Sequence, residues 1–481
     1  MTARDVIYGG QRLAAVLGAA LLLTGASQCS FGGHDFGPAS HSDTNQIAIA
    51  PISTFGSIVA AATDFSTGSA TVKLDGNAVD ESQLRPGQVV TLSGTVASGG
   101  LTGTAAAASV TNKLIGPVSA IDPGAGSFTV LGQTVHVSGN TSVGPGFTLP
   151  DVAGFPVGTV LVIDGYRTST GLVASRIDLP LAGQVLHVAG VVSGLDGFVH
   201  QFSINGTRID YGSASGGLPS LVTDGSYVIA SGGSSTNSTT LQATLVTAAK
   251  ESPAGASGDH GVVHGAVTRF ATSTDFDVAG QTVTTSAATT FIHGAQTDVM
   301  LDRELEVAGT YSSSGVLAAS TVDVTPAPIF RVVGPVASLD PSGATLTIDG
   351  ITVSTSRATR WDDQSGQGIK AFGLSRVTTG DWVEVRGLPG PGTAATARVV
   401  ERRVVPSPAF VELQDVPTAI AAPAFTLTGV PVDTRTATFA DASGQPLSPS
   451  GFFAQAAGRV VRVRGAFIAG AVTAAAVALR P

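Results

Sequence analysis

The chain of 481 residues has one cysteine, two tryptophans and two methionines, and only 12% of its residues are charged. A single cysteine excludes an intramolecular disulfide. The net charge of −9 argues against a nucleic-acid partner, because affinity for nucleic acid depends on neutralising phosphates. Apolar residues still make up 43% of the chain. This fraction is enough to build hydrophobic cores, so the composition does not indicate disorder.

Glycine is abundant, with 61 residues, and it outlines an eight-residue frame that recurs six times. The frames span residues 87–94, 158–165, 225–232, 302–309, 380–387 and 458–465. In the fifth frame, "GDWVEVRG", Val383 and Val385 alternate with Glu384 and Arg386, which predicts a half-buried strand between two glycine turns. The fourth and sixth positions are apolar in every copy and predict the core face. We expect Glu384 and Arg386 to lie on a solvated face.

Each frame is preceded by a second recurring pattern, two short apolar runs around a central glycine. The pairs Asp75-Gly76, Asn205-Gly206 and Asp349-Gly350 are strong signals for tight hairpins, since both turn positions need positive φ. With one strand before the hairpin and one after the frame, each unit of about 70 residues has five strands, with a break after the third. This order favours an all-β fold of tandem, small five-stranded barrels of OB type. Small β-sandwiches are the alternative, which spacing does not separate from barrels.

The repeats divide the chain into eight predicted segments. These are a signal peptide (1–28), a flexible tether (29–50), unit 1 (51–111), unit 2 (112–180), unit 3 (181–248), unit 4 (249–325), unit 5 (326–404) and a divergent unit 6 (405–481).

The N-terminal segment predicts export. Residues 13–23 form an apolar run after Arg4 and Arg12 and before small residues, which is typical of a cleaved signal and too short for a comfortable membrane span. Cys29, in "LTGASQC", resembles the lipidated cysteine of a bacterial lipoprotein box, although Gln28 departs from the small residue usual at that position. We expect a periplasmic or outer-membrane lipoprotein anchored at Cys29, or a simply secreted, extracellular protein.

The fullest unit reads "GPVASLD…LTIDGITVST…TRW…GDWVEVRG…ATARVVE" over residues 334–401. It resembles the bacterial family called domain of unknown function 5666, which consists of small β-rich repeats in exported or lipid-anchored envelope proteins. The resemblance covers roughly residues 51–481 and is best in units 2, 4 and 5. Unit 6 departs most, with "FVELQDV" (410–416) in place of the usual Gly-x-Val start. The resemblance implies no particular activity.

Two clusters are candidates for chemistry. His260 and His264, beside Asp259, have the i,i+4 spacing that binds zinc on a helix. In an extended segment these positions are roughly 13 Å apart, so we expect a polar linker and strand start instead. In "WDD" (361–363), we expect Trp361 at a core or rim position, and Asp362 and Asp363 capping a turn or binding a cation.

No nucleophile elbow, cysteine pair or dinucleotide fingerprint is present in the sequence. We therefore predict no catalytic, cofactor-binding or metal-binding residues and no cofactor. The expected function is that of a non-catalytic exported envelope protein with a structural or binding role. The alternatives are an adhesin-like array that binds polysaccharide or protein, and an enzyme with a site on one unit. The expected partner is an envelope protein or polysaccharide and not nucleic acid, with membrane contact only through a lipid at Cys29.

Overall fold

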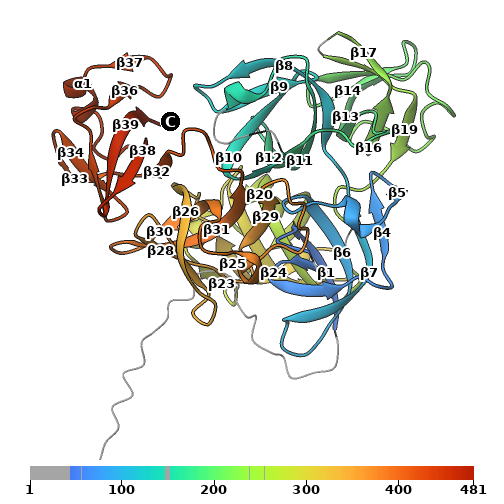
Figure 1. Ribbon diagram of the computed structural model, residues 1–481. Coiled ribbons are helices and arrows are strands. Elements are labelled where there is room, and N and C mark those ends of the chain that lie inside the picture. The colour runs from blue at the N-terminus through green and yellow to red at the C-terminus, as the bar shows by residue number, and fades with distance from the viewer. Residues whose placement is uncertain are drawn as a thin grey trace, which may run out of the picture. The chain divides into compact units, whose positions relative to one another are not determined.

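The computed structural model describes residues 44–480, apart from residues 56, 146, 148–151, 238 and 254. The predicted signal peptide and Cys29 lie outside the described residues. The prediction of an all-β fold is confirmed, because the described strands form three mixed sheets (Figure 1). Within the described ranges the one α-helix is the short α1 (Pro449–Phe453). No helix in this part of the chain is long and apolar enough to cross a membrane.

Unit 5 shows the strand pairing most completely. Its strands are β26 (Phe330–Asp340), β27 (Thr345–Ile348), β28 (Ile351–Ser354), β29 (Arg360–Gln364), β30 (Trp382–Pro389) and β31 (Ala394–Arg403). The pairing runs β26-β27-β28-β31-β30 and returns from β30 to β26. Within this circle the β28–β31 pair is parallel and the other pairs are antiparallel, and β29 pairs with β31 in parallel outside the circle.

The other units repeat this order with local breaks. Unit 2 has β8 (Leu114–Asp122), β9 (Ser127–Val130), β10 (Gln133–Val143), β11 (Val160–Thr168) and β12 (Gly171–Asp178). Unit 3 has β13 (Leu186–Asp196), β14 (Gln201–Ile204), β15 (Thr207–Asp210), β16 (Tyr227–Gly232), β17 (Ser234–Asn237), β18 (Thr240–Gln242) and β19 (Leu245–Ala248). Unit 4 has β20 (His260–Thr272), β21 (Asp275–Val278), β22 (Gln281–Thr284), β23 (Thr290–Ile292), β24 (Glu304–Tyr311) and β25 (Leu317–Val324).

The first and last units differ most at their starts. The strands assigned to unit 1 are β1 (Thr44–Pro51), β2 (Ile58–Ala60), β3 (Thr63–Ser66), β4 (Thr71–Leu74), β5 (Asn77–Ala78), β6 (Val89–Val96) and β7 (Thr102–Val110). Unit 6 has β32 (Val411–Asp415), β33 (Thr418–Ala421), β34 (Ala424–Leu427), β35 (Val430–Asp433), β36 (Thr438–Ala440), β37 (Pro446–Leu447), β38 (Val461–Ile468) and β39 (Ala471–Leu479). Strand β1 begins within the segment predicted as a tether, and β32 takes the place of the missing Gly-x-Val start.

The predicted core face of the frame is confirmed. All twelve side chains at its fourth and sixth positions are buried at 0% exposure; they are Val90, Leu92, Leu161, Ile163, Val228, Ala230, Leu305, Val307, Val383, Val385, Val461 and Val463. The opening glycine is a turn position, as in Gly380 with φ of 91°. The closing glycine is not a turn, contrary to our prediction. In β30 it is Gly387, at a β-bulge against β31, where an added Cβ would overlap the carbonyl oxygen of Thr396.

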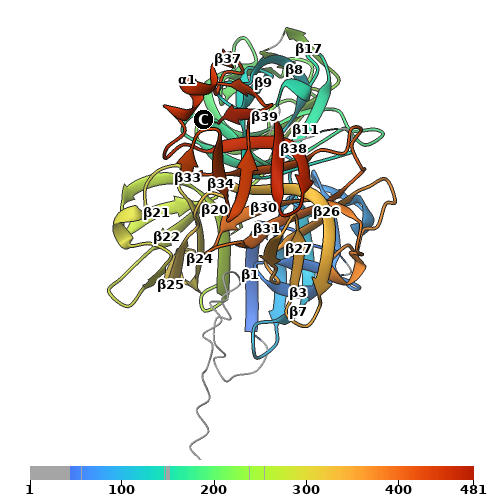
Figure 2. The ribbon, with the colours of Figure 1, turned by 60° about the vertical axis from the view of Figure 1, so that its left-hand side comes forward.

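Three sheets result because strands of different units pair. In two sheets the partners are consecutive units, through β8 with β13 and β26 with β32. The third sheet joins units 1 and 4, because β1 pairs in parallel with β20, with Ile47 opposite Gly261 and Ile49 opposite Val263 (Figures 1 and 2). Units far apart in sequence therefore share one ladder of backbone hydrogen bonds.

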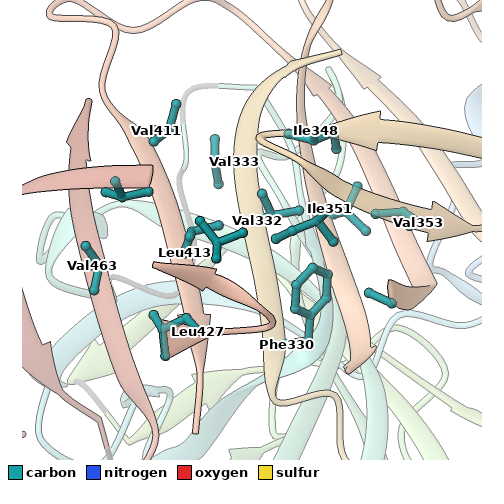
Figure 3. Close-up of a cluster of buried hydrophobic side chains, with 14 of the residues drawn as sticks. Phe330, Val332, Val333, Ile348, Ile351, Val353, Val411, Leu413, Leu427 and Val463 are labelled. Carbon is teal, nitrogen blue, oxygen red and sulfur yellow. The ribbon is translucent and has the colours of Figure 1, made fainter. Parts of the chain in front are cut away.

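The largest hydrophobic core spans units 5 and 6 and is continuous across the β26–β32 pair. Figure 3 shows Val332 of β26 close to Ile351 of β28, and Leu413 on the neighbouring β32. These side chains are at most 1% exposed. Because β26 and β32 hold the two units together, residues at their outward positions are fixed relative to each other.

Candidate functional site

The outward face of unit 5 is buried, although alternation in "GDWVEVRG" predicted a solvated face. Glu384 and Arg386 are only 1% and 3% exposed. Isolated charges at this depth would be costly, so they need partners of opposite sign. The prediction of a solvated face was wrong because the covering residues belong to a different unit.

These charges form a buried ion-pair network of three arginines and three glutamates, namely Arg331, Glu384, Arg386, Glu401, Arg403 and Glu412. Glu384 is its centre, with carboxylate oxygens 2.9 Å from Nε of Arg331, 3.1 Å from Nη2 of Arg403 and 3.3 Å from Nε of Arg386. Burial alone would raise the pKa of Glu384, but the three guanidinium groups lower it to about 2. Glu384 is therefore an anion at neutral pH.

Strand register explains how the network assembles. Glu384 on β30 lies directly opposite Glu401 on β31, and Arg331 on β26 lies directly opposite Arg386. Like charges in direct opposition repel each other. Arginines at diagonal or adjacent positions neutralise each carboxylate and offset this repulsion. Arg403 is an example, because its Nη2 is 2.5 Å from an oxygen of Glu401.

Backbone carbonyls of unit 2 complete the network. Arg386 donates hydrogen bonds to the carbonyl oxygens of Gly139, at 3.2 Å, and Thr141. Arg360 of β29 donates to the carbonyl of Asn140 at 2.5 Å. These acceptors lie in β10, more than 200 residues away in sequence. The end of β10 therefore covers the charged face of unit 5.

A second ion pair ties the same units together. Arg176 of β12 is 2% exposed, and its Nη1 lies 2.6 Å from Asp362 of β29. The same nitrogen donates to the carbonyl oxygen of Pro86 in unit 1 at 2.8 Å. One guanidinium thus joins units 1, 2 and 5.

A cleft of about 310 Å³ opens on the ion-pair network where units 5 and 6 meet. Its charged lining is Arg331, Glu384, Arg403, Glu412 and Arg464, and its remaining lining is Pro145, Phe147, Val333, Gln364, Trp382, Val404, Pro406 and Phe410. A cleft of mostly apolar walls with a few fixed polar groups is the usual form of a ligand site.

A smaller polar cavity of about 170 Å³ lies where units 1, 2 and 4 meet. Asp164 in its lining is 1% exposed, and burial raises its pKa to about 7, despite the nearby Lys113 and backbone N–H donors. Lys113 lies 3.6 Å from Glu251 and donates to the hydroxyl of Tyr227 at 3.2 Å. The charges in this cavity also bridge units.

The structure separates the histidines singled out in the sequence. Both lie on β20, but His260 is exposed whereas His264 binds Glu304 at 2.7 Å and Glu306 at 3.4 Å. Burial lowers the pKa of His264, but these two carboxylates outweigh it and raise the pKa to about 9. Among the described residues no three histidine, cysteine or acidic side chains are grouped to hold a metal.

The "WDD" cluster forms part of β29 and is not a loop. Trp361 is buried at 5% exposure, as predicted for a core position. Asp363 accepts hydrogen bonds from the backbone N–H groups of Ser365 and Ile369, so the predicted turn capping is confirmed for this residue. Asp362 instead pairs with Arg176 of unit 2. Sequence reasoning missed the network itself; the available signal was a concentration of opposite charges on adjacent strands in a chain otherwise poor in charge.

The fold and the cleft define a class, an all-β protein of tandem related units with buried ion pairs between them. The family model described as "Domain of unknown function (DUF5666)" matches residues 115–178, 264–323 and 333–401. Three segments of the chain thus match the family that the sequence resembled. Comparison with curated proteins and comparison with solved structures each gave no significant match.

Proposed function

We propose that this protein is a non-catalytic, exported envelope protein whose tandem β-barrel units form a rigid scaffold with a binding cleft. The cleft between units 5 and 6 carries this proposal. The β26–β32 pair fixes the two units that line the cleft relative to each other. The buried charge at the base of the cleft, Glu384, forms ion pairs with Arg331 and Arg403. A preorganised concave site on rigid strands supports a binding role, because little conformational entropy of the protein is lost when a partner binds.

The assignment of OB-type barrels is part of this proposal. It is supported by the circular pairing β26-β27-β28-β31-β30-β26, in which β28 and β31 are parallel. Unit 2 has the same circle, through the additional β8–β11 pair. A closed circle leaves no free edge within a unit, which suits a protein exposed to other chains. The segment boundaries given above are proposed with it, except that unit 1 begins at Thr44 with β1, which shortens the proposed tether.

The partner is proposed to be an envelope protein or polysaccharide, and the location to be the periplasm, the outer membrane through a lipid at Cys29, or the extracellular space. Export is supported by the apolar run at residues 13–23. Fractionation of cells that express the full chain tests the location. Recovery only in the cytoplasm would contradict export, and equal incorporation of a lipid precursor into wild type and Cys29→Ser would exclude lipidation of Cys29.

In-cell crosslinking tests the binding role. A photo-crosslinking amino acid at Val404, which lines the cleft and is 67% exposed, is expected to capture an envelope component. The same amino acid at Leu221, which is 87% exposed in unit 3, is the matched control and is expected to capture none. Equal labelling at both positions, or none at Val404, would contradict binding at the cleft.

A further inference from the structure

The cleft between units 5 and 6 has a lining that is specific enough to indicate the chemistry of its ligand. Val333 and Trp382 are 8% and 7% exposed, and with Phe410 they supply aromatic and aliphatic surface. The volume of about 310 Å³ accommodates one aromatic ring system or one large apolar side chain with its polar end. The body of a fitting ligand is therefore apolar.

The charges around the cleft favour an anionic end. The lining contains three arginines and two glutamates, an excess of one positive charge. Arg331 pairs with both glutamates, at 2.9 Å from Glu384 and 2.5 Å from Glu412. Because these carboxylates are already neutralised by arginines of the ion-pair network, they repel a bound anion only weakly.

Arg464 is the arginine placed to receive that anion. Its side chain is 47% exposed, and its guanidinium carbon lies 5.3 Å from the ring centre of Phe410. The carboxylate of Glu412 is 4.0 Å from Nε, and no hydrogen bond joins the guanidinium of Arg464 to another residue that the structure describes. The planar fork of a guanidinium held against an aromatic ring suits a carboxylate, which it can bind through two parallel hydrogen bonds.

A buried acceptor adds a third element. Gln364 lines the cleft at 7% exposure and donates from Nε2 to Asp362 at 2.5 Å. Its Oε1 is buried and has no hydrogen-bond partner within the described ranges. Buried polar atoms are normally satisfied, so this oxygen calls for a donor from whatever occupies the cleft. An N–H or O–H group beside the carboxylate would serve.

We infer that the cleft binds an apolar carboxylate, a ligand with an aromatic or aliphatic body, one carboxylate at Arg464 and a donor toward Gln364. This inference rests on the binding role proposed above and specifies its ligand. Two sources share this chemistry. One is a free aromatic carboxylic acid, and the other is the C-terminal residue of an apolar peptide, whose amide N–H is the donor.

Calorimetric titration of the purified full chain tests the inference. The probes are mandelic acid against mandelamide, which both carry a phenyl ring and a hydroxyl donor, and the peptide Ala-Val-Phe with a free against an amidated C-terminus. Binding of at least one free acid about tenfold tighter than that of its neutral analogue is expected, since charge-assisted hydrogen bonds are roughly twice as strong as neutral ones. Tighter binding of the acid in only the mandelate arm or only the peptide arm identifies the source.

Two variants decide whether Arg464 is responsible. Arg464→Gln is expected to abolish the preference for the acid, and the exposure of this residue predicts an unchanged unfolding curve. Arg435→Gln, in the same unit but 74% exposed and paired with Asp433, is the control and should keep the preference. Equal binding of acid and neutral probes, no binding of any probe, or a preference retained in Arg464→Gln would overturn the inference. These outcomes are independent of in-cell crosslinking at Val404, so failure of the ligand class is distinguishable from failure of the binding role.

Discussion

Glu384 is the residue whose replacement most directly tests the buried ion-pair network. Glu384→Gln keeps the size and one carbonyl oxygen of the side chain but removes its charge. Three guanidinium groups within 3.3 Å then lose their central anion, while Glu401 and Glu412 remain. The variant leaves an uncompensated positive charge at a position that is 1% exposed.

The expected cost follows from these distances. At an effective dielectric constant of about 20, each ion pair near 3 Å contributes roughly 5 kcal/mol of attraction, most of which is offset by desolvation. Removing one partner of a buried pair leaves the other charge desolvated without its attraction, and this typically costs about 3–5 kcal/mol of stability. Glu384→Gln should therefore lower the free energy of unfolding by about 3–5 kcal/mol.

Urea unfolding followed by tryptophan fluorescence measures this loss locally, because both tryptophans, Trp361 and Trp382, lie in unit 5. The matched control is Glu306→Gln, at the same frame position in unit 4. Glu306 is 25% exposed and lies 3.4 Å from His264, so its replacement should cost about 1 kcal/mol when unfolding is followed by far-ultraviolet circular dichroism. A loss of 1 kcal/mol or less for Glu384→Gln would refute the argument that this network is a buried, interdependent unit.

The remaining predictions concern pH and backbone geometry. The pKa of His264 rises from about 6.5 unfolded to about 9 folded. The stability that its ion pairs contribute is therefore complete below pH 6.5 and is lost as the pH rises through 9. His264→Gln should lower the free energy of unfolding by about 2–3 kcal/mol at pH 6 and by almost nothing at pH 10, as measured by urea unfolding at both pH values. Burial raises the pKa of Asp349 to about 7. Asp349→Asn should therefore have the stability of wild type near pH 3.5 and become more stable than wild type as the pH rises to 7, with a constant difference above pH 7. Asn205-Gly206 shows that asparagine suits the turn, and a thermal melt in which the variant is no more stable than wild type at pH 8 would contradict the prediction. Gly387→Ala should lower the free energy of unfolding by about 2–4 kcal/mol through the bulge, whereas Gly373→Ala, with open space around it, should change it by less than about 1 kcal/mol; similar losses in both would show that the bulge tolerates a Cβ.

The sequence predicted well what depends on neighbouring residues. Alternation placed Val383 and Val385 in the core, and the Asp349-Gly350 pair adopts the positive φ values of a tight hairpin, at 49° and 79°. Both features follow from strand periodicity and turn sterics, which act over a few residues. The class of fold followed from their recurrence.

The surroundings of Glu384 were not predictable in the same way. Period two separates the faces of a strand, but it does not show whether the outer face meets water or another unit. Here the cover is β10, and no periodicity in "GDWVEVRG" records that Arg386 reaches the carbonyl of Gly139. Contacts between units depend on the pairing of distant segments, which a single sequence does not reveal.

The first unit also started earlier than expected. Unit 1 was predicted to begin at residue 51, but Thr44–Pro51 forms β1 and pairs with β6. The hairpin equivalent to Asp349-Gly350 is the β2–β3 turn, while Asp75-Gly76 joins β4 to β5 in the link. A true local turn signal was thus assigned to the wrong place in the repeat.

The parallel pairing of β1 with β20 has a consequence for the order in which the chain folds. Residues 46–49 of β1 pair with residues 260–263, so β1 cannot complete one of its two edges until more than 200 further residues have been made. Closing so long a loop before any gain from contacts slows folding, and an open strand edge during that delay invites association with other chains. A chain synthesised from its N-terminus therefore spends part of its lifetime with β1 half paired, and a chaperone that shields this edge would raise the yield of folded protein.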